Sequence, residues 1–151
     1  MLDRKTPPRF NRSLSFDLIS PIVKKLANGI EIFFIPGGQQ DVMKVELVFK
    51  AGRWYEHFSG AGYFSSHLLP KGTAQKSSFE IAEHFDQLGA HLEISPGLDV
   101  VSISLYALTQ TAEKALKLLM EVLKEATFPE KEIEQSKSIY IQNLKVNNEK
   151  T

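Results

Sequence analysis

Alternating hydrophobic and polar positions predict strands in three stretches of the chain, residues 23–36, 43–50 and 99–107. The first stretch is expected to be a hairpin, because its turn pair Asn28-Gly29 tolerates two positive φ angles. A further strand is expected near residues 90–95. The apolar residues that share a face are Ile30, Ile32 and Phe34, then Val45, Leu47 and Phe49, and finally Val101, Ile103, Leu105 and Ala107.

Helical spacing of apolar residues appears in the remaining segments. Ser77-x-x-Glu80 is a capping box that starts a helix, and Gly89 stops it. Residues 111–126 are expected to form a helix with one apolar stripe, and Pro129 fits the first turn of a last helix. The stripe of the first of these consists of Ala112, Ala115, Leu116, Leu119, Leu123 and Ala126, and the buried side of the last helix is expected at Ile133, Tyr140 and Leu144.

The expected order of elements is β-β-β-α-α-β-β-α-α. Hairpin-joined strands with helices that can cover one face predict an α+β domain with a largely antiparallel sheet. Residues 1–22 contain Pro7, Pro8 and Pro21 and are expected to form an extended arm, with a single domain over residues 23–151. Because the last helix runs into KVNNEKT without a domain-closing element, we expect this domain to be a fragment of a longer two-domain subunit.

Charge and composition exclude several classes of function. Basic and acidic side chains are equal in number at 18 each, so no net charge favours nucleic acid or an acidic membrane surface. Six basic side chains lie in residues 1–25, where they could bind a partner or form a solvated tail. The chain has no cysteine and no apolar run of membrane-spanning length. It also has no secretory leader, and a cytoplasmic location is therefore expected unless the chain has been trimmed.

The residues that could carry chemistry do not form a familiar catalytic set. The four histidines are His57, His67, His84 and His91, and no two lie one helical turn apart as a zinc site needs. His67 and His84 fall on neighbouring predicted helices and could meet in space, although a lone histidine is usually a hydrogen-bonded structural group. Ser66 cannot use the adjacent His67 as a base, because neighbouring helical residues point about 100° apart.

One stretch, GYFSSHLLPKGT at residues 62–73, has the frame of a catalytic motif. It resembles the signature of the insulinase/pitrilysin-like zinc peptidases, a family that includes the mitochondrial processing peptidase and embeds the inverted zinc motif H-x-x-E-H. Under this resemblance the first zinc histidine falls on Tyr63 and the general-base glutamate on Ser66. The second histidine is retained as His67. The third ligand, a glutamate on the last helix, falls on Asn143.

The resemblance extends over nearly the whole chain from about residue 23. LANGIEIFFIP is similar to the family's first hairpin, and FKAGRWYE to the segment before the motif. SSFEIAEHFDQLGAHLE and LKLLMEVLKEATFPEKEIEQSK are similar to the helical segments that follow it.

The resemblance implies a degenerate, non-catalytic member of the family. One histidine cannot hold catalytic zinc, so no catalytic residue, metal ligand set or cofactor is expected. Such members, among them bacterial subunits that accompany an active zinc peptidase, imply a partner subunit and an extended peptide added to a sheet edge. Two alternatives remain, namely a zinc-dependent metalloendopeptidase with a rearranged site at His67 and His84, and a purely structural scaffold subunit. The isolated domain is also expected to form a weak homodimer.

Overall fold

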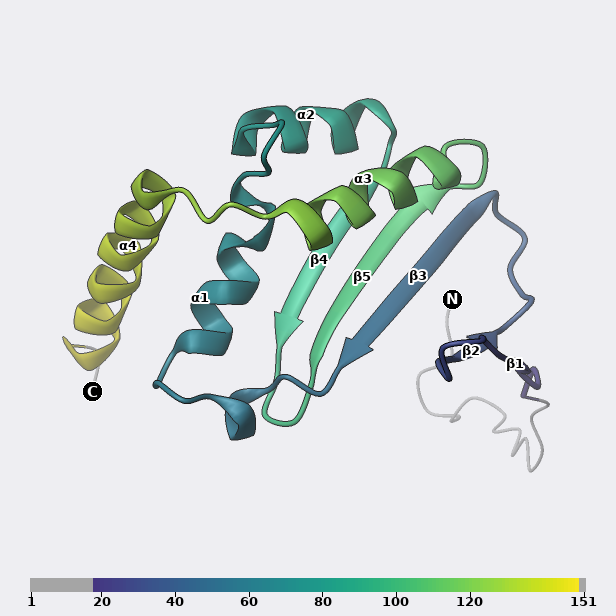
Figure 1. The fold of residues 1–151 in the computed structure, drawn as a ribbon, viewed down its shortest axis with the longest axis horizontal. Coiled ribbons are helices and arrows are strands. Elements are labelled where there is room, and N and C mark those ends of the chain that lie inside the picture. The colour runs from purple at the N-terminus through teal and green to yellow at the C-terminus, as the bar shows by residue number, and fades with distance from the viewer. Residues whose placement is uncertain (1–17, 150–151) are drawn as a thin grey trace, which may run out of the picture. The chain divides into compact units, whose positions relative to one another are not determined.

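The structure is a computed structural model that describes residues 18–149 (Figure 1). The chain divides after Gln40 into two units, which are described separately. The expected arm lies outside the described residues except at its end, where Ile22 already belongs to a strand. The first unit holds β1 (Ile22–Lys25) and β2 (Glu31–Phe34), paired in antiparallel fashion as the sequence predicts.

The hairpin between β1 and β2 has a wider turn than the Asn28-Gly29 pair suggests. Gly29 has a φ of 89°, but Asn28 is not among the described residues with positive φ. The Leu26 amide donates to the Ile30 carbonyl at 2.8 Å, and the Ile30 amide donates to Asn28 Oδ1 at 3.2 Å. The predicted hairpin is therefore present, but only Gly29 uses a positive φ, and the side chain of Asn28 accepts a hydrogen bond within a longer loop.

The second unit is built on a three-stranded antiparallel sheet of β3 (Val42–Phe49), β4 (His91–Pro96) and β5 (Val101–Leu108). The strand order is β3-β5-β4, so β5 is central and β4 is an edge strand of this sheet. Pairing places Leu105 between Val45 and Leu92, and Ile103 between Leu47 and Ile94. The apolar positions predicted from alternation thus form one continuous face of the sheet.

Helices cover that apolar face, which confirms the α+β prediction. The helices of this unit are α1 (Ala61–Leu68), α2 (Ser78–Gln87), α3 (Ala112–Glu125) and α4 (Glu130–Glu149), of which α4 packs against α1. Two short 3₁₀ turns are η1 (Arg53–Tyr55) and η2 (Leu69–Lys71). Figure 1 shows α2 and α3 over the sheet and α1 beside β4. Ile81 and Phe85 of α2 and Leu119 and Val122 of α3 pack with Leu105 of β5 in the core.

The helices begin and end where the local sequence signals predict, whereas their buried faces differ in part from the predicted ones. The capping box of α2 is formed as predicted, with the Ser77 amide donating to Glu80 Oε2 at 2.8 Å. In α3 the buried residues include Leu118 and Val122, while the expected Leu116 and Leu123 are only half-buried. The stripe is rotated because α3 packs against both β5 and α2, so its buried arc is set by two neighbours.

The last helix begins directly after Pro129 but buries fewer residues than expected. Ile133 and Tyr140 are half-buried, and Ser136 is the only fully buried residue over Glu130–Glu149. Leu144, predicted to be buried, is 46% exposed. In the second unit α4 packs against α1, with Tyr140 in contact with Tyr63, so much of its surface stays exposed.

Candidate functional site

The helix that carries the candidate site, α1, begins where a carboxylate from the preceding loop caps it. Glu56 accepts hydrogen bonds from the amides of Gly60 and Gly62, each at 2.9 Å. These are donors that a helix N-terminus leaves without partners. A Cβ on Gly62 would lie 2.8 Å from Glu56 Oε1, so a larger residue here would displace the capping carboxylate.

Tyr63, Ser66 and His67 share one face of α1, as their i, i+3, i+4 spacing requires. The rings of Tyr63 and His67 are parallel within 5°, with centroids 5.9 Å apart. Ser66 is buried, Tyr63 is half-buried and His67 is exposed. The structure therefore brings these three predicted positions together, with His67 as the member most accessible to solvent.

The fourth predicted position, Asn143, lies on α4, which packs against α1. The contact is made by Tyr140, whose ring centroid lies 4.9 Å from that of Tyr63 and 5.3 Å from that of Phe64. Asn143 follows Tyr140 by three residues, so the two share a side of the helix, and Asn143 is exposed. A close approach of Asn143 to His67 stays a prediction. Sequence analysis placed Tyr140 on the buried side of the helix but missed its contact with Tyr63.

After α1 the chain turns sharply and is fixed against the segment between α3 and α4. The Gly72 carbonyl accepts from the Thr127 amide at 3.0 Å, and a Cβ on Gly72 would lie 2.8 Å from Pro129 Cγ. Thr73 Oγ1 donates to Glu121 Oε1 at 2.9 Å. These contacts hold Lys71, the residue just before them, at a defined place in the fold.

The Glu121 carboxylate joins the turn after Gly72 to α3. It also forms an ion pair with Lys76 at 2.7 Å, and both side chains are about one-fifth exposed. The hydrogen bond from Lys76 lowers the pKa of Glu121, partly offset by burial and reinforced by the hydrogen bond from Thr73. The Glu121 carboxylate is thus occupied by structural partners, and Lys71 takes part in none of the ion pairs found within residues 18–149.

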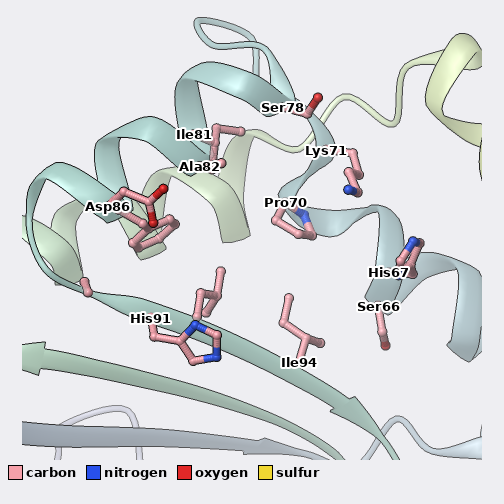
Figure 2. Close-up of a pocket in the computed structure, with 13 residues that line it drawn as sticks. Ser66, His67, Pro70, Lys71, Ser78, Ile81, Ala82, Asp86, His91 and Ile94 are labelled. Atoms are coloured by element: carbon pink, nitrogen blue, oxygen red, sulfur yellow. The ribbon is translucent and has the colours of Figure 1, made fainter.

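A cavity of about 330 Å³ lies between α1, η2, α2 and β4 (Figure 2). Its apolar lining residues are Pro70, Ile81, Ala82, Phe85, Ala90, Leu92 and Ile94. Its polar lining residues are Ser66, His67, Lys71, Ser78, Asp86 and His91. Ser66 and His67 of the degenerate motif therefore line the cavity. Lys71 and Asp86, which sequence analysis did not single out, line it as well.

The donor set at this place does not fit zinc. Tetrahedral zinc takes thiolates, imidazoles and carboxylates as ligands, and Tyr63, Ser66 and His67 contain one such group. No cluster of three histidine, aspartate or glutamate side chains suited to a metal occurs within residues 18–149. His67 and His84 line different cavities, and His84 Nδ1 lies 2.6 Å from the Glu80 carbonyl of its own helix. The lack of a cofactor in the working protein stays a prediction.

No helix within residues 18–149 combines the length and the apolar content needed to cross a bilayer.

Comparison with known proteins agrees with the geometry. Residues 37–151 match the sequence pattern of the family described as insulinase (peptidase family M16). An uncharacterized zinc protease of Rickettsia felis is 27% identical over 124 residues, covering 81% of this chain and 30% of that protein. Cytochrome b-c1 complex subunit 1 of Bos taurus is 28% identical over 127 residues, covering 83% of this chain and 26% of that protein.

A solved structure shares the fold. The crystal structure of a peptidase M16 inactive domain from Pseudomonas fluorescens superimposes with a TM-score of 0.78 at 25% identity, covering 84% of this chain and 32% of that chain. This chain thus spans about a third or less of the proteins that it matches. The match over residues 37–151 and the shared arrangement of helices on an antiparallel sheet establish that the chain belongs to the insulinase (peptidase M16) family.

Proposed function

We propose that this domain is the non-catalytic, peptidase-like part of a subunit that binds an extended peptide and pairs with an active metallopeptidase. The observation that carries the proposal is the position of the cavity. It lies alongside β4, which is an edge strand of the sheet, next to the helix face where the catalytic groups of the family would stand.

The lack of catalysis follows from the residue types on that face. Hydrolysis by a zinc peptidase needs a metal-bound water and a glutamate to take its proton. Ser66 stands where that glutamate would be, and a serine hydroxyl is not a base near neutral pH. Tyr63 is packed between the rings of His67 and Tyr140, which gives it a structural role in joining α1 to α4.

Peptide binding is supported by the position of β4 at the edge of the described three-stranded sheet. An edge strand offers unpaired amide and carbonyl groups that an extended chain can pair with, while alternate side chains enter neighbouring pockets. The strand begins at His91 and the cavity borders it from that residue to Ile94. A peptide added to this edge would therefore place side chains into the cavity.

Pairing with another subunit is supported by the names of related proteins. The Pseudomonas fluorescens structure is described as an inactive domain, and the bovine relative is a subunit of a larger complex. An inactive domain can still form one wall of a substrate chamber in which a partner subunit catalyses the reaction.

The binding mode is tested with a fluorescent extended peptide and its analogue N-methylated at alternate residues. We expect the parent peptide to bind and to slow hydrogen exchange of the β4 amides, and the analogue to bind weakly because it cannot complete the main-chain hydrogen bonds. Pairing is tested by co-purification with a candidate subunit that retains an intact H-x-x-E-H. Binding of neither peptide would favour the scaffold alternative, and equal binding of both would contradict strand addition.

A further inference from the structure

We propose that the cavity beside β4 is polarised and selects a peptide strand carrying an apolar residue flanked by an acidic residue on one side and a basic residue on the other. This inference rests on the proposed peptide binding and specifies which peptide the site takes. The juxtaposition that carries it is Lys71 and His67 at the α1 end of the cavity and Asp86 at the α2 end (Figure 2).

The middle of the cavity is suited to one apolar side chain. Ile81 is 1% exposed and Phe85 is 6% exposed, so both belong to the rigid core and cannot move away from a ligand. Leu92 and Ile94 of β4 are half-buried and complete the apolar surface. The volume of about 330 Å³ is at the low end of the range for ligand sites, which favours a side chain and its neighbours over a large molecule.

The α1 end of the cavity is cationic. Lys71 is half-buried and takes part in none of the ion pairs formed within the described residues, in contrast to Lys76 close by. The Gly72 and Thr73 contacts fix the backbone at Lys71, so only its side chain has to become ordered when a ligand binds. His67 is exposed and lines the same cavity. A carboxylate of the ligand would find hydrogen-bond donors here.

The α2 end of the cavity is anionic. Asp86 lies in the last turn of α2, where the helix carries a partial negative charge and an acidic side chain is unfavourable. Within residues 18–149 Asp86 also forms no ion pair. A basic side chain of a ligand would neutralise both the carboxylate and the helix end. The peptide position next to Asp86 should therefore prefer Lys or Arg.

The strand β4 runs between the anionic and the cationic end of the cavity, so the repeat of an added peptide strand sets the spacing of the charges on the peptide. Figure 2 shows Asp86 and His91 toward one end of the cavity and Ser66 and Ile94 toward the other. Side chains on one face of a strand recur about every 6.8 Å, so the same-face neighbours of a central apolar residue lie about that far to either side of it. The preferred sequence is therefore acid-x-apolar-x-base, or its reverse if the added strand runs in the opposite direction.

The test uses a set of fluorescein-labelled seven-residue peptides with leucine at the centre, read by fluorescence anisotropy. The residues two before and two after leucine are Asp and Lys, Lys and Asp, Ala and Ala, Asp and Asp, or Lys and Lys. We expect one mixed order to bind about threefold to tenfold more tightly than the others, the gain of two partly exposed ion pairs. In the double variant Lys71→Glu, Asp86→Lys, the other mixed order should become the preferred one.

The matched control exchanges a charged pair elsewhere, with Lys117→Glu and Glu113→Lys on α3, and should leave the ranking of the peptides unchanged. All substituted side chains are at the surface, and circular dichroism checks that each variant folds. Equal affinity for all five peptides would overturn the charge selection while leaving peptide binding intact. Failure of every peptide to bind would overturn the proposed function and this inference together.

Discussion

The Tyr63 ring lies parallel to the His67 ring, with an interplanar angle of 5° and a centroid separation of 5.9 Å. In the zinc motif that this segment resembles, both positions hold metal-binding imidazoles. Here the first is a phenol that also contacts Tyr140 of α4 at 4.9 Å. Relative to the motif that it resembles, this helix face exchanges an imidazole for a phenol, and Tyr63, His67 and Tyr140 form an aromatic contact between α1 and α4.

This exchange predicts that the protein takes up little zinc. After dialysis against zinc-containing buffer and then metal-free buffer, we expect well below one zinc per chain by mass spectrometric metal analysis, and no peptidase activity. The variant Tyr63→His, Ser66→Glu, Asn143→Glu should bind zinc, because it restores the ligands. Tight one-to-one zinc in the unaltered protein, lost in His67→Ala, would contradict the prediction. A failure of the restored variant would show that Asn143 does not approach His67.

The cap of α1 predicts a measurable loss of stability. Glu56→Ala removes the acceptor for the Gly60 and Gly62 amides and should lower the free energy of unfolding by about 0.5–2 kcal/mol, the usual effect of a lost N-terminal cap. Urea unfolding followed by circular dichroism measures it. Glu83→Ala, an exposed position on α2, is the control and should change stability much less. Equal effects of the two substitutions would argue against the cap.

The ion pair between Lys76 and Glu121 predicts a pH-dependent contribution to stability. The pKa of Glu121 is lowered from 4.5 in the folded state, first by the hydrogen bond from Lys76. The contribution of the ionised Glu121 to the free energy of unfolding is therefore present above pH 4.5. It is lost as the pH falls through the lowered pKa of the folded state.

Glu121→Gln should accordingly lower the free energy of unfolding by about 1–3 kcal/mol at pH 7, and the difference from the unaltered protein should shrink in acid. Urea unfolding at a series of pH values measures both. Glu113→Gln, which breaks an exposed pair with Lys117, should have a much smaller effect. A difference that is constant with pH would show that Glu121 acts through packing rather than charge.

The loop before α1 predicts weak self-association of the isolated domain. Trp54, Tyr55 and Phe58 are 75%, 56% and 80% exposed, and hydrogen bonds from the Arg53 and Trp54 amides to the turn at 97–98 hold the loop in place. Ordered, exposed aromatic residues are typical of interfaces. Sedimentation equilibrium should show a dimer at high concentration that Trp54→Ala weakens. Phe79→Ala, an exposed aromatic on α2, should not weaken it, and a strict monomer would contradict the prediction.

Several parts of the fold could be predicted because their signals are local. The alternation in residues 99–107 depends only on the two-residue period of a strand, and all four predicted inward positions of β5 are buried. The capping box at Ser77 and Glu80 is a contact within one turn, and it forms as expected. The hairpin at Asn28-Gly29 also forms, whereas its loop length could not be predicted, because several loop lengths can use the same Asn-Gly pair.

The residue types alone define the chemistry available on the face of α1 that holds the motif, since Tyr63, Ser66 and Asn143 are poor zinc ligands in any fold. The contacts of that face depend on how the elements pack together. Packing of α4 on α1 placed Tyr140 against Tyr63, and the turn at Gly72 brought Lys71 to the cavity that Asp86 borders from another helix. These pairs are 77 and 15 residues apart in the chain. Periodicity reports which face of one element is apolar, whereas contacts between elements depend on how their whole surfaces fit together.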